Sequence, residues 1–339
     1  MRGALLGVGR VAVNGHIPGW KRRREIELAA AADCRDSSRE AFLGLFPSAR
    51  WYSDPEELLA RERLDFVDIC TPPDTHGRLI RASLERSCHV LCEKPLVVKA
   101  GDLGPLAALA ATRDRTLVTV HNWLHAPALA KLSALLREGA IGRPRRCRWE
   151  TLRTEPAGAS GDSGNWRMDP ARAGGGVLLD HGWHAVSAVN SWLGKPRTVW
   201  ARLTTERHRD FAVEDTAILE IDYGSSSAEI RLTWAANERA NRIEVEGDDG
   251  VLRLDGGTIR LETERAAARE RGWDFPPLTE GSHHPDWFDG VIEDFLSEVA
   301  DTSRRGKNLD EAALCVTVLS LAQQSSHRNE VLPVPDLGR

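Results

Sequence analysis

Three side chains in this sequence have types and positions that suit proton transfer: Lys94, Asp180 and His184. Lys94 comes after a short apolar run, residues 89–92, and before Pro95, whose ring fixes φ and lacks an N–H donor. Asp180 and His184 are four residues apart, a spacing that puts both on one face of a helix. A carboxylate in that position can hold the imidazole by its N–H, as a general base requires. A fixed cation and a base together indicate chemistry that develops negative charge on an oxygen.

Both motifs also have a purely structural interpretation. Glu93, Lys94 and Pro95 are equally typical of the solvated, charged turn that ends a strand. Asp180 can cap a helix, and His184 can be a partly buried histidine with ordinary hydrogen bonds. The surrounding sequence has to decide between the two interpretations.

A glycine-rich turn near the N-terminus indicates a dinucleotide site. In Gly7-Val-Gly9-Arg-Val-Ala12 the glycines allow a tight turn and a close approach of the backbone to a pyrophosphate. Ala12 lets the following helix pack on its strand, and the first N–H groups of that helix face the anion. Asp33 lies twenty-one residues after Ala12, where an acid can accept hydrogen bonds from a ribose diol.

The residues around Asp33 bear on the choice of nucleotide. The charge of Asp33 suits the free diol of NAD and would repel the additional phosphate of NADP. Arg35, two residues further on, has the charge to bind that phosphate instead. We therefore expect NAD as the cofactor and keep NADP as the alternative.

The order of the expected elements indicates an α/β fold with two domains. In residues 1–121, apolar strands alternate with helices, which predicts a doubly wound parallel sheet of the Rossmann type. In residues 122–339, strands of period two predict an α+β domain with a large, mostly antiparallel sheet that has helices on one face. The expected strands are 3–8, 26–32, 66–70, 89–92, 116–120, 145–154, 199–203, 217–221, 228–234, 243–245 and a hairpin over 251–261. The expected helices include 37–46, 77–86, 101–112, 127–137, 309–323 and one that ends at Leu193.

Composition and charge exclude several classes of protein. With 339 residues, 41% of them hydrophobic, the chain can bury more than one core. A net charge of -5, from 45 basic and 50 acidic residues, does not indicate nucleic-acid binding. No apolar run approaches the roughly 20 residues of a membrane span, and Arg10 interrupts the apolar start that a signal peptide needs. The six cysteines form no C-x-x-C pair, which is typical of reduced thiols in a cytoplasmic protein.

These motifs occur together in an order typical of one family. They are Gly7-Val-Gly9-Arg-Val-Ala12, Asp33, Thr71-Pro-Pro-Asp-Thr-His76, Glu93-Lys94-Pro95 and Gly174-Gly-Gly…Asp180…His184. With them the chain resembles the Gfo/Idh/MocA oxidoreductases, nicotinamide-dependent enzymes that act largely on sugars, cyclitols and their derivatives. The resemblance covers nearly the whole chain, and it implies a homodimer or homotetramer formed through the C-terminal sheet.

The resemblance implies a role for each matched residue. Lys94 and His184 would face the reacting carbon with Asp180 supporting them, His184 as the base and Lys94 as the electrostatic partner, or with these two roles exchanged. The bond before Pro95 is often cis in such proteins, so a cis bond is expected here too. The residues expected to hold the cofactor are Gly7, Gly9, Arg10, Val11, Ala12, Asp33, Arg35, Thr71, Pro72, His76, Glu93, Lys94 and Asn122.

Two departures from the family pattern affect the substrate. Leu124 stands where many relatives carry an arginine, and Ser187 stands where many carry an aspartate. Both changes remove polar contacts near the expected substrate, so its identity cannot be taken from well-known relatives. Flat indole faces suit the apolar side of a sugar ring, although most tryptophans are core residues. The residues expected to contact the substrate are Lys94, Trp123, Trp166, Arg167, Asp180 and His184.

Three other functions fit parts of the sequence. A metal enzyme could draw ligands from Asp180, His181, His184, His283 and His284, or from the pair His121 and His125, but no H-E-x-x-H motif is present and we expect no metal. A cofactor-binding sensor without turnover would keep the fold and lose the chemistry. A redox-neutral enzyme would use nicotinamide transiently to process glycosides.

Overall fold

The computed structural model describes residues 1–158, 165–263, 270–281 and 283–337, which form two compact units. The first unit consists of Met1–Asn122 and His283–Ala313, and the second of Trp123–Ser282 and Leu314–Arg339. The chain therefore leaves the first unit, returns to it and leaves it again. The expected boundary near residue 121 coincides with the first crossing, but it did not anticipate the return of residues 283–313.

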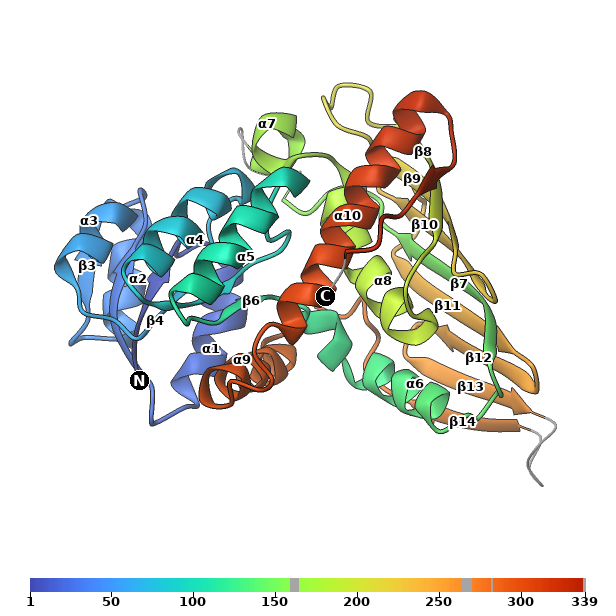
Figure 1. Ribbon diagram of the computed structural model, residues 1–339, viewed down its shortest axis with the longest axis horizontal. Helices are drawn as coiled ribbons and strands as arrows, with labels where there is room; N and C mark the ends of the chain where they lie inside the picture. The colour runs from blue at the N-terminus through green and yellow to red at the C-terminus, as the bar shows by residue number, and fades with distance from the viewer. Residues whose placement is uncertain (159–164, 264–269, 282, 338–339) are drawn as a thin grey trace. The chain divides into compact units, whose positions relative to one another are not determined.

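The first unit is built on a six-stranded parallel sheet with the order β3-β2-β1-β4-β5-β6, which confirms the predicted Rossmann topology (Figure 1). The strand order reverses between β1 and β4, and ligands of such sheets bind beyond the carboxyl ends of the strands at that point. The strands are β1 (Arg2–Leu6), β2 (Glu27–Ala32), β3 (Arg50–Tyr52), β4 (Phe66–Ile69), β5 (His89–Cys92) and β6 (Leu117–Thr119).

Helices cover both faces of this sheet. The chain after the glycine-rich turn is helical over 10–21 and includes a π-helical turn, η1 (Ala12–His16), before α1 (Ile17–Lys21). A π turn accommodates one more residue than an α turn, and such turns are often found at functional sites. The other elements are α2 (Ser37–Leu45), α3 (Pro55–Arg61), η2 (Pro73–Thr75), α4 (His76–Glu85), η3 (Ala100–Asp102) and α5 (Leu103–Thr112).

The returning segment completes the core of the first unit. Helix α9 (Pro285–Ala300) places Phe288 and Phe295 in a buried cluster with Trp20 of α1 and Phe66 of β4. Phe295 lies 5.7 Å from Phe66 and 6.3 Å from Trp20, measured between ring centroids. Because the aromatic residues of α9 bury most of their surface here, the Rossmann sheet depends on this late segment for one of its two covering layers.

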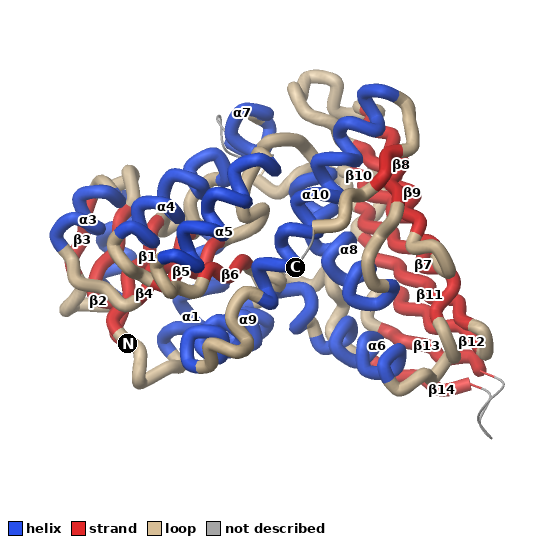
Figure 2. Tube along the Cα trace, viewed as in Figure 1, coloured by secondary structure: helices blue, strands red, loops and turns tan. Residues whose placement is uncertain are grey.

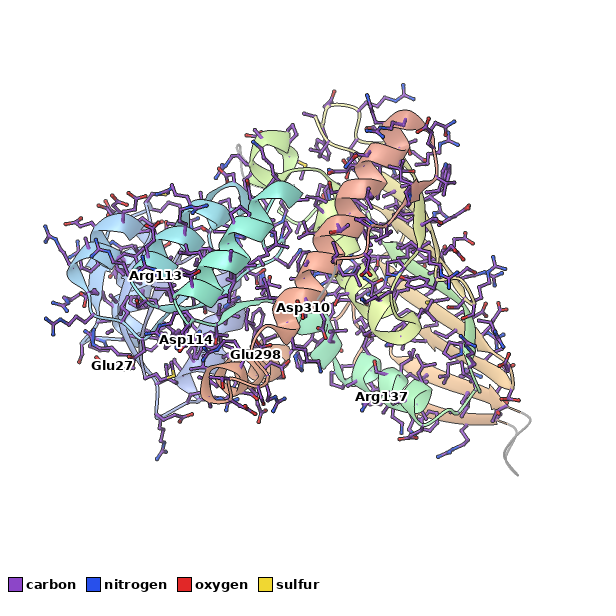
Figure 3. All side chains as sticks on the ribbon, viewed as in Figure 1. Glu27, Arg113, Asp114, Arg137, Glu298 and Asp310 are labelled. Carbon is purple, nitrogen blue, oxygen red and sulfur yellow. The ribbon has the colours of Figure 1, made fainter. Side chains whose placement is uncertain are left out.

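The start of α10 (Lys307–Arg328) is tied to the edge of the same sheet. The side chain of Asn308 accepts from the Thr119 amide at 2.8 Å and donates to the Thr119 carbonyl at 3.0 Å, so it pairs with β6 as a neighbouring strand would. Glu298, labelled in Figure 3, accepts from the amides of Gly306 and Asn308 and so fixes the turn between α9 and α10. These bonds hold residues 298–308 to the first unit.

The second unit contains a nine-stranded sheet with the order β14-β13-β12-β11-β7-β10-β9-β8-β15 (Figure 2). Only the central pair, β7 and β10, is parallel, which confirms the expected mostly antiparallel sheet. The expected hairpin turn falls at Gly256, whose φ is +62°. The strands are β7 (Pro144–Leu152), β8 (Thr198–Thr204), β9 (Thr216–Asp222), β10 (Ser227–Thr233), β11 (Ala240–Gly247), β12 (Gly250–Asp255), β13 (Thr258–Thr263), β14 (Glu270–Asp274) and β15 (Leu332–Pro333).

One face of this sheet packs on helices and the other carries ion pairs. The helical elements of the unit are η4 (Asn122–His125), α6 (Pro127–Arg137), η5 (Trp166–Met168), α7 (Pro170–Ala173), α8 (Val177–Leu193) and the later part of α10. Along each central strand buried apolar residues alternate with charged ones, as the period-two pattern predicted. On the charged face, Arg148 bonds Glu244 and Glu246, and Arg253 bonds Glu244. Within the described ranges, no helix is long and apolar enough to cross a membrane.

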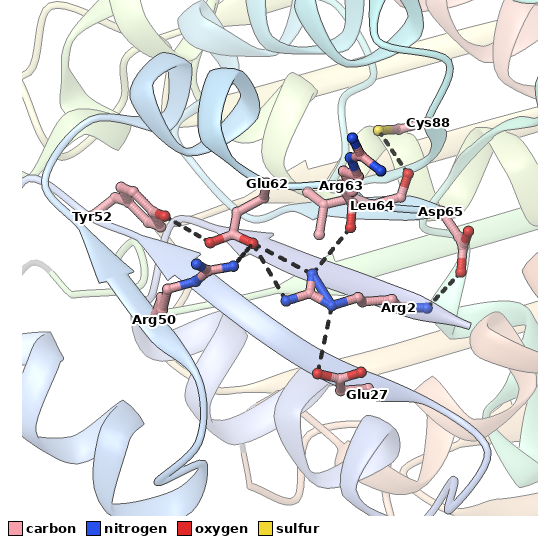
Figure 4. A network of polar contacts seen from close by, with 9 residues as sticks. All are labelled: Arg2, Glu27, Arg50, Tyr52, Glu62, Arg63, Leu64, Asp65 and Cys88. Atoms are coloured by element: carbon pink, nitrogen blue, oxygen red, sulfur yellow. Dashed lines mark hydrogen bonds and ion pairs between the residues drawn. The ribbon is translucent and has the colours of Figure 1, made fainter.

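At the amino ends of the Rossmann strands, a fully buried carboxylate joins three elements (Figure 4). Glu62, just after α3, accepts from Arg50 of β3 at 2.5 Å, from the Tyr52 hydroxyl at 2.7 Å and from Arg2 of β1 at 3.4 Å. The Glu62 side chain has no exposed surface, whereas Arg2 and Arg50 remain partly exposed. A buried carboxylate of this kind is tolerated only while cations and hydrogen-bond donors pair with it.

We predict that Glu62→Ala lowers the free energy of unfolding by about 1–3 kcal/mol, because the Tyr52 hydroxyl and two guanidinium groups lose their common acceptor. Chemical denaturation of the purified variant measures this change. Glu57→Ala is the control, since Glu57 pairs with exposed Arg61 four residues on and its loss should change stability by less than about 0.5 kcal/mol. Equal effects of the two substitutions would contradict the prediction.

Candidate active site

The glycine-rich turn between β1 and the first helix is shaped by close backbone contacts. Gly7 has φ +90°, and a Cβ atom there would lie 2.8 Å from the Cys70 carbonyl carbon and from Thr71 Cγ2. Only glycine fits this position without strain. Above Gly9, by contrast, a Cβ atom would meet only the Arg35 guanidinium, at 3.5 Å. The backbone at Gly9 is therefore open to close approach by a ligand.

Asp33 follows β2 and is fixed beside this turn. Its carboxylate accepts from the Val8 amide at 2.7 Å and from the Arg35 amide at 2.8 Å, and the Arg35 side chain lies 3.2 Å away. Burial opposes ionisation of Asp33, but the hydrogen bonds from Arg35 and Val8 outweigh it and lower its pKa. The turn thus holds an ionised acid and a guanidinium side by side.

The residues of this end of the sheet fit a dinucleotide. Gly7 and Gly9 form an open turn, Arg10 lies exposed at the start of the helix, and Val11 and Ala12 pack beneath it. Asn122, at the end of the first unit, has a buried Oδ1 without a hydrogen-bond partner among the described residues. An acceptor left in this way is suited to a donor from a bound ligand.

Two loops at the carboxyl ends of β4 and β5 are joined by His76. Its Nδ1 lies 2.9 Å from the Pro95 carbonyl and its Nε2 lies 2.9 Å from the Thr71 carbonyl. Burial lowers the pKa of His76, which has no exposed surface. His76 therefore acts inside the protein, where it fixes the loop of Thr71 and Pro72 against the turn that contains Lys94. The Lys94–Pro95 bond is cis, as expected.

Glu93, the residue before Lys94, is held by hydrogen bonds on both of its carboxylate oxygens. Glu93 accepts from the Lys94 amide through Oε2 at 2.9 Å, and its Oε1 lies 3.0 Å from Nε2 of His16 in the π turn. The other ring nitrogen of His16 lies 2.8 Å from Asp68 of β4, which also accepts from Trp20 at 2.7 Å. Both oxygens of Glu93 therefore contact protein groups.

In the second unit, the backbone of Gly176, the last of the three glycines before α8, packs closely against the backbone of Glu214. A Cβ atom on Gly176 would lie 2.0 Å from the Glu214 carbonyl oxygen, so no side chain fits there. The Glu214 carboxylate in turn accepts from the amides of Gly176 at 2.8 Å and Leu178 at 3.1 Å and caps the helix. Gly174 has φ +80°, and its carbonyl oxygen accepts a hydrogen bond from the side chain of Gln323 of α10 at 2.8 Å. These contacts fix the start of the helix that carries Asp180 and His184.

Asp180 lies in the first turn of α8 among basic groups. Its carboxylate is 3.9 Å from Nε of Arg167 and 3.8 Å from Nε2 of His181. The Arg167 guanidinium stacks on the Trp166 ring with its Cζ atom 4.4 Å from the ring centroid. The structure thus brings together Asp180, Trp166 and Arg167, three of the residues expected to contact the substrate. It also places His181, considered from the sequence as a metal ligand, within 3.8 Å of Asp180.

His184 lies one turn further along α8 and is largely buried, with 7% of its surface exposed. Its imidazole stacks on the Trp123 indole with ring centroids 4.8 Å apart and an interplanar angle of 11°. Trp123 is itself packed on Trp149 of β7. The indole fixes the plane of the imidazole, a role that was not foreseen when Trp123 was expected to contact the substrate.

Several residues important to these sites were not expected from the sequence. His16, Asp68 and Trp20 support Glu93, and Glu214 supports the start of α8. Asp68 gave the clearest signal, since an acid within the otherwise apolar strand 66–69 needs a buried partner. Nothing comparable in the sequence pointed to Glu214.

One group of side chains in the described ranges has the spacing of a metal site: His16, Asp68 and Cys70. It differs from the histidine groups considered from the sequence. Asp68 already accepts from His16 and Trp20, and Cys70 donates to it at 3.6 Å. Burial raises the pKa of the Cys70 thiol, so this group is the protonated donor rather than a thiolate ligand.

The fold and the first site together indicate a dinucleotide-binding protein of the oxidoreductase class with a second unit built on a mostly antiparallel sheet. Comparisons with known protein families agree with this class. Residues 1–121 match the oxidoreductase family with an NAD-binding Rossmann fold, and residues 129–253 match the GFO/IDH/MocA C-terminal domain. The chain belongs to the GFO/IDH/MocA family, and its first unit is an NAD-binding Rossmann domain.

The chain is similar to individual relatives in sequence and to a solved structure in fold. D-apiose dehydrogenase of Paraburkholderia graminis is 27% identical over 77% of this chain and 69% of its own length. D-xylose 1-dehydrogenase (NADP(+)) 2 of Haloferax volcanii is 33% identical over 66% of both chains. The structure of levoglucosan dehydrogenase with NADH and levoglucosan superimposes with a TM-score of 0.86 at 17% identity, over 99% of this chain and 100% of the other, which shows a shared fold.

We predict that Asp33→Ala weakens NAD binding by about 10- to 100-fold, because a charge-assisted hydrogen bond to the ribose is lost. NADP binding should change much less, so the preference for NAD narrows. Fluorescence titration with both nucleotides measures the change. Arg35→Ala is the paired variant and should weaken NADP more than NAD; a similar loss for both nucleotides in each variant would rule out these roles.

We predict that Gly176→Ala lowers the free energy of unfolding by about 1–3 kcal/mol, because the added methyl group overlaps the Glu214 carbonyl. Thermal unfolding tests this. Gly44→Ala is the matched control, since no atom lies within 4 Å of its would-be Cβ and alanine favours helix by about 0.5–1 kcal/mol. The two substitutions should therefore act in opposite directions, and a neutral Gly176→Ala would show that the start of α8 is adaptable.

Proposed function

We propose that this protein is an NAD-dependent dehydrogenase that transfers hydride between the nicotinamide and a secondary alcohol or ketone of a sugar, cyclitol or related polyol. The main support is the presence of both halves of the required chemistry in one chain of this family. The NAD-binding domain carries Lys94 in a fixed turn after β5, and the second unit carries Asp180 and His184 on one helix. Relatives named for apiose and xylose support a sugar as substrate.

In the proposed reaction, each of three side chains has one task. The Lys94 ammonium stabilises the negative charge that develops on the substrate oxygen during oxidation. His184 accepts the hydroxyl proton, and Asp180 supports its charged form and orients the substrate. NAD, when bound, accepts the hydride. Lys94 and His184 could exchange roles, since each can carry a proton.

The substrate would be recognised by an aromatic surface and by charge. Trp166, stacked with Arg167, presents a flat face next to a guanidinium that lies near Asp180. Such a surface suits the apolar side of a sugar ring together with its hydroxyl groups. Trp123 contributes by holding the His184 ring. The part of the site that would bind the cofactor is shaped by Thr71, Pro72, His76, Glu93 and Asn122.

Assembly and location form a further part of the proposal. The charged face of the nine-stranded sheet would mediate a homodimer or homotetramer, with its Arg and Glu side chains as the contact groups. The six cysteines are thiols rather than disulfide partners in the described part of the chain, and four of them are buried, which favours a reducing compartment such as the cytoplasm. Light scattering of the purified protein tests the subunit number.

We predict that Lys94→Ala and His184→Ala each lower kcat by about 100- to 1,000-fold, because each removes a group that stabilises the transition state. NADH production with a panel of sugars and cyclitols measures turnover, and titration should show cofactor affinity close to that of the unchanged protein. Lys99→Ala and His327→Ala, at exposed positions, are the controls and should retain full activity. A normal rate in either active-site variant would remove that residue from the mechanism.

The same panel separates the two other functions. A sensor of this fold would bind NAD and oxidise no member of the panel. A redox-neutral enzyme would alter a glycoside with no net production of NADH. Only the dehydrogenase couples loss of the substrate to stoichiometric NADH.

A further inference from the structure

We propose that His16 is a permanently protonated positioning residue, which fixes Glu93 and, through Glu93, the backbone of Lys94. The inference deepens the proposed function, because it rests on Lys94 as the cation of the reaction. It concerns the buried row of side chains Asp68, His16 and Glu93, which we call the carboxylate–imidazole row.

The positions of the two acids define the protonation of His16. Nδ1 of His16 lies 2.8 Å from Asp68 Oδ2 and 3.0 Å from Oδ1, and Nε2 lies 3.0 Å from Glu93 Oε1. A carboxylate oxygen only accepts hydrogen bonds, so both ring nitrogens must donate. Only the imidazolium form has two N–H groups, and His16 therefore carries a positive charge between the two acids.

The electrostatic environment agrees with this geometry. Burial disfavours the charge on His16, but the charge of Asp68 and the hydrogen bonds and other interactions with Asp68 and Cys70 together outweigh it and raise the pKa of His16 well above the usual value. Burial likewise opposes ionisation of Glu93, but the hydrogen bonds from His16 and the Lys94 amide, together with the charges of His16 and Lys94, outweigh it and lower the pKa of Glu93. The Cys70 thiol and the apolar ring of Phe288 also face His16.

Each end of the row is anchored. Asp68 has no exposed surface and accepts a second bond from the Trp20 indole at 2.7 Å. Glu93 uses its other oxygen to accept from the Lys94 amide at 2.9 Å. A rigid strand at one end is therefore connected through His16 to the amide of the proposed catalytic lysine at the other.

The rest of the unit is shaped to keep His16 in place. The π turn, residues 12–16, directs the imidazole toward β4, and His16 has no exposed surface. Phe288 of α9 covers the ring with a centroid distance of 4.2 Å. On the neighbouring residue, Gly15, a Cβ atom would lie 2.7 Å from the Phe288 ring. Glycine at this position therefore allows the Phe288 ring to pack over His16.

Loss of His16 would leave two buried acids with no cation between them. One of them would take up a proton or turn away, since isolated buried charges are strongly disfavoured. Glu93 is the freer of the two, because its side chain is 13% exposed and it lies in a turn. The Lys94 backbone would lose its acceptor, and a displacement of about 1 Å at a reacting group can cost about 100-fold in rate.

Nitrogen-15 NMR of histidine-labelled protein with NAD bound tests the protonation directly. We expect two N–H signals from His16 at every pH from about 6 to 9, identified by their loss in His16→Gln. His89, at the opposite end of β5, is the internal reference, because burial and nearby arginines lower its pKa to about 4 and keep it neutral over this range. A His16 ring that titrates near pH 6.5, or one equivalent of zinc per chain in the purified protein, would overturn the proposal.

Kinetics test the positioning role. His16→Gln and Asp68→Asn should lower kcat by about 10- to 100-fold while the KM for NAD stays within about threefold, because the row acts on Lys94 rather than on cofactor binding. Glu93→Gln, which keeps an acceptor for Lys94, should lose less activity than Glu93→Ala. His89→Gln is the matched control and should keep its kcat.

The two levels of the proposal fail in different ways. Absence of turnover with every sugar and cyclitol would refute the proposed function, while the NMR signals would still report on His16. Full kcat in His16→Gln, in a protein that does oxidise a member of the panel, would refute the positioning role alone. Circular dichroism of each variant verifies folding, and Asp68→Asn serves if His16→Gln does not fold.

Discussion

Charge buried beneath the carboxyl ends of β4 and β5 has to be neutralised locally, because water does not reach it. In the first unit this is achieved by alternation: Asp68, His16 and Glu93 follow one another as acid, cation and acid. The same rule applies at the other end of the sheet, where Glu62 is held by Arg2, Arg50 and Tyr52. Both ends of the Rossmann sheet are thus fixed by polar groups that tolerate little displacement.

The second unit fixes its candidate residues by different means. Close backbone contact at Gly176 and the Glu214 cap set the start of α8, and stacking on Trp123 sets the plane of the His184 ring. Neither contact uses a buried ion pair. The His184 ring is thus positioned by aromatic stacking, whereas the backbone of Lys94 is bonded to a carboxylate, Glu93, that itself contacts His16.

Local patterns in the sequence were sufficient for most of the fold. Glycine spacing identified the nucleotide turn, alternation identified the central strands, and the hairpin at Gly256 followed from its two glycines. The π turn at residues 12–16 was not predicted, because a single additional residue barely alters a helical pattern. The short strands β3, β14 and β15 were missed, because none of them lies in an apolar run long enough to show periodicity.

The candidate site was predictable only where one motif carried both partners. Asp180 and His184 are near each other in sequence, and so are Glu93 and Lys94. His16 and Glu93 are 77 residues apart, and His16 and Asp68 are 52 apart, so their contacts follow from the sheet topology and not from spacing. For the same reason the amphipathic residues of α9 did not reveal that they pack on β4 and α1.

The return of α9 to the first unit has a consequence for synthesis of the protein. A nascent chain released as far as residue 121 has made all six Rossmann strands, yet Trp20 and Phe66 still lack the aromatic cover that Phe288 and Phe295 bring. Domains that are continuous in sequence can fold one after another as they leave the ribosome. Here the amino-terminal domain must wait, with an open apolar face, until more than 160 further residues have been translated.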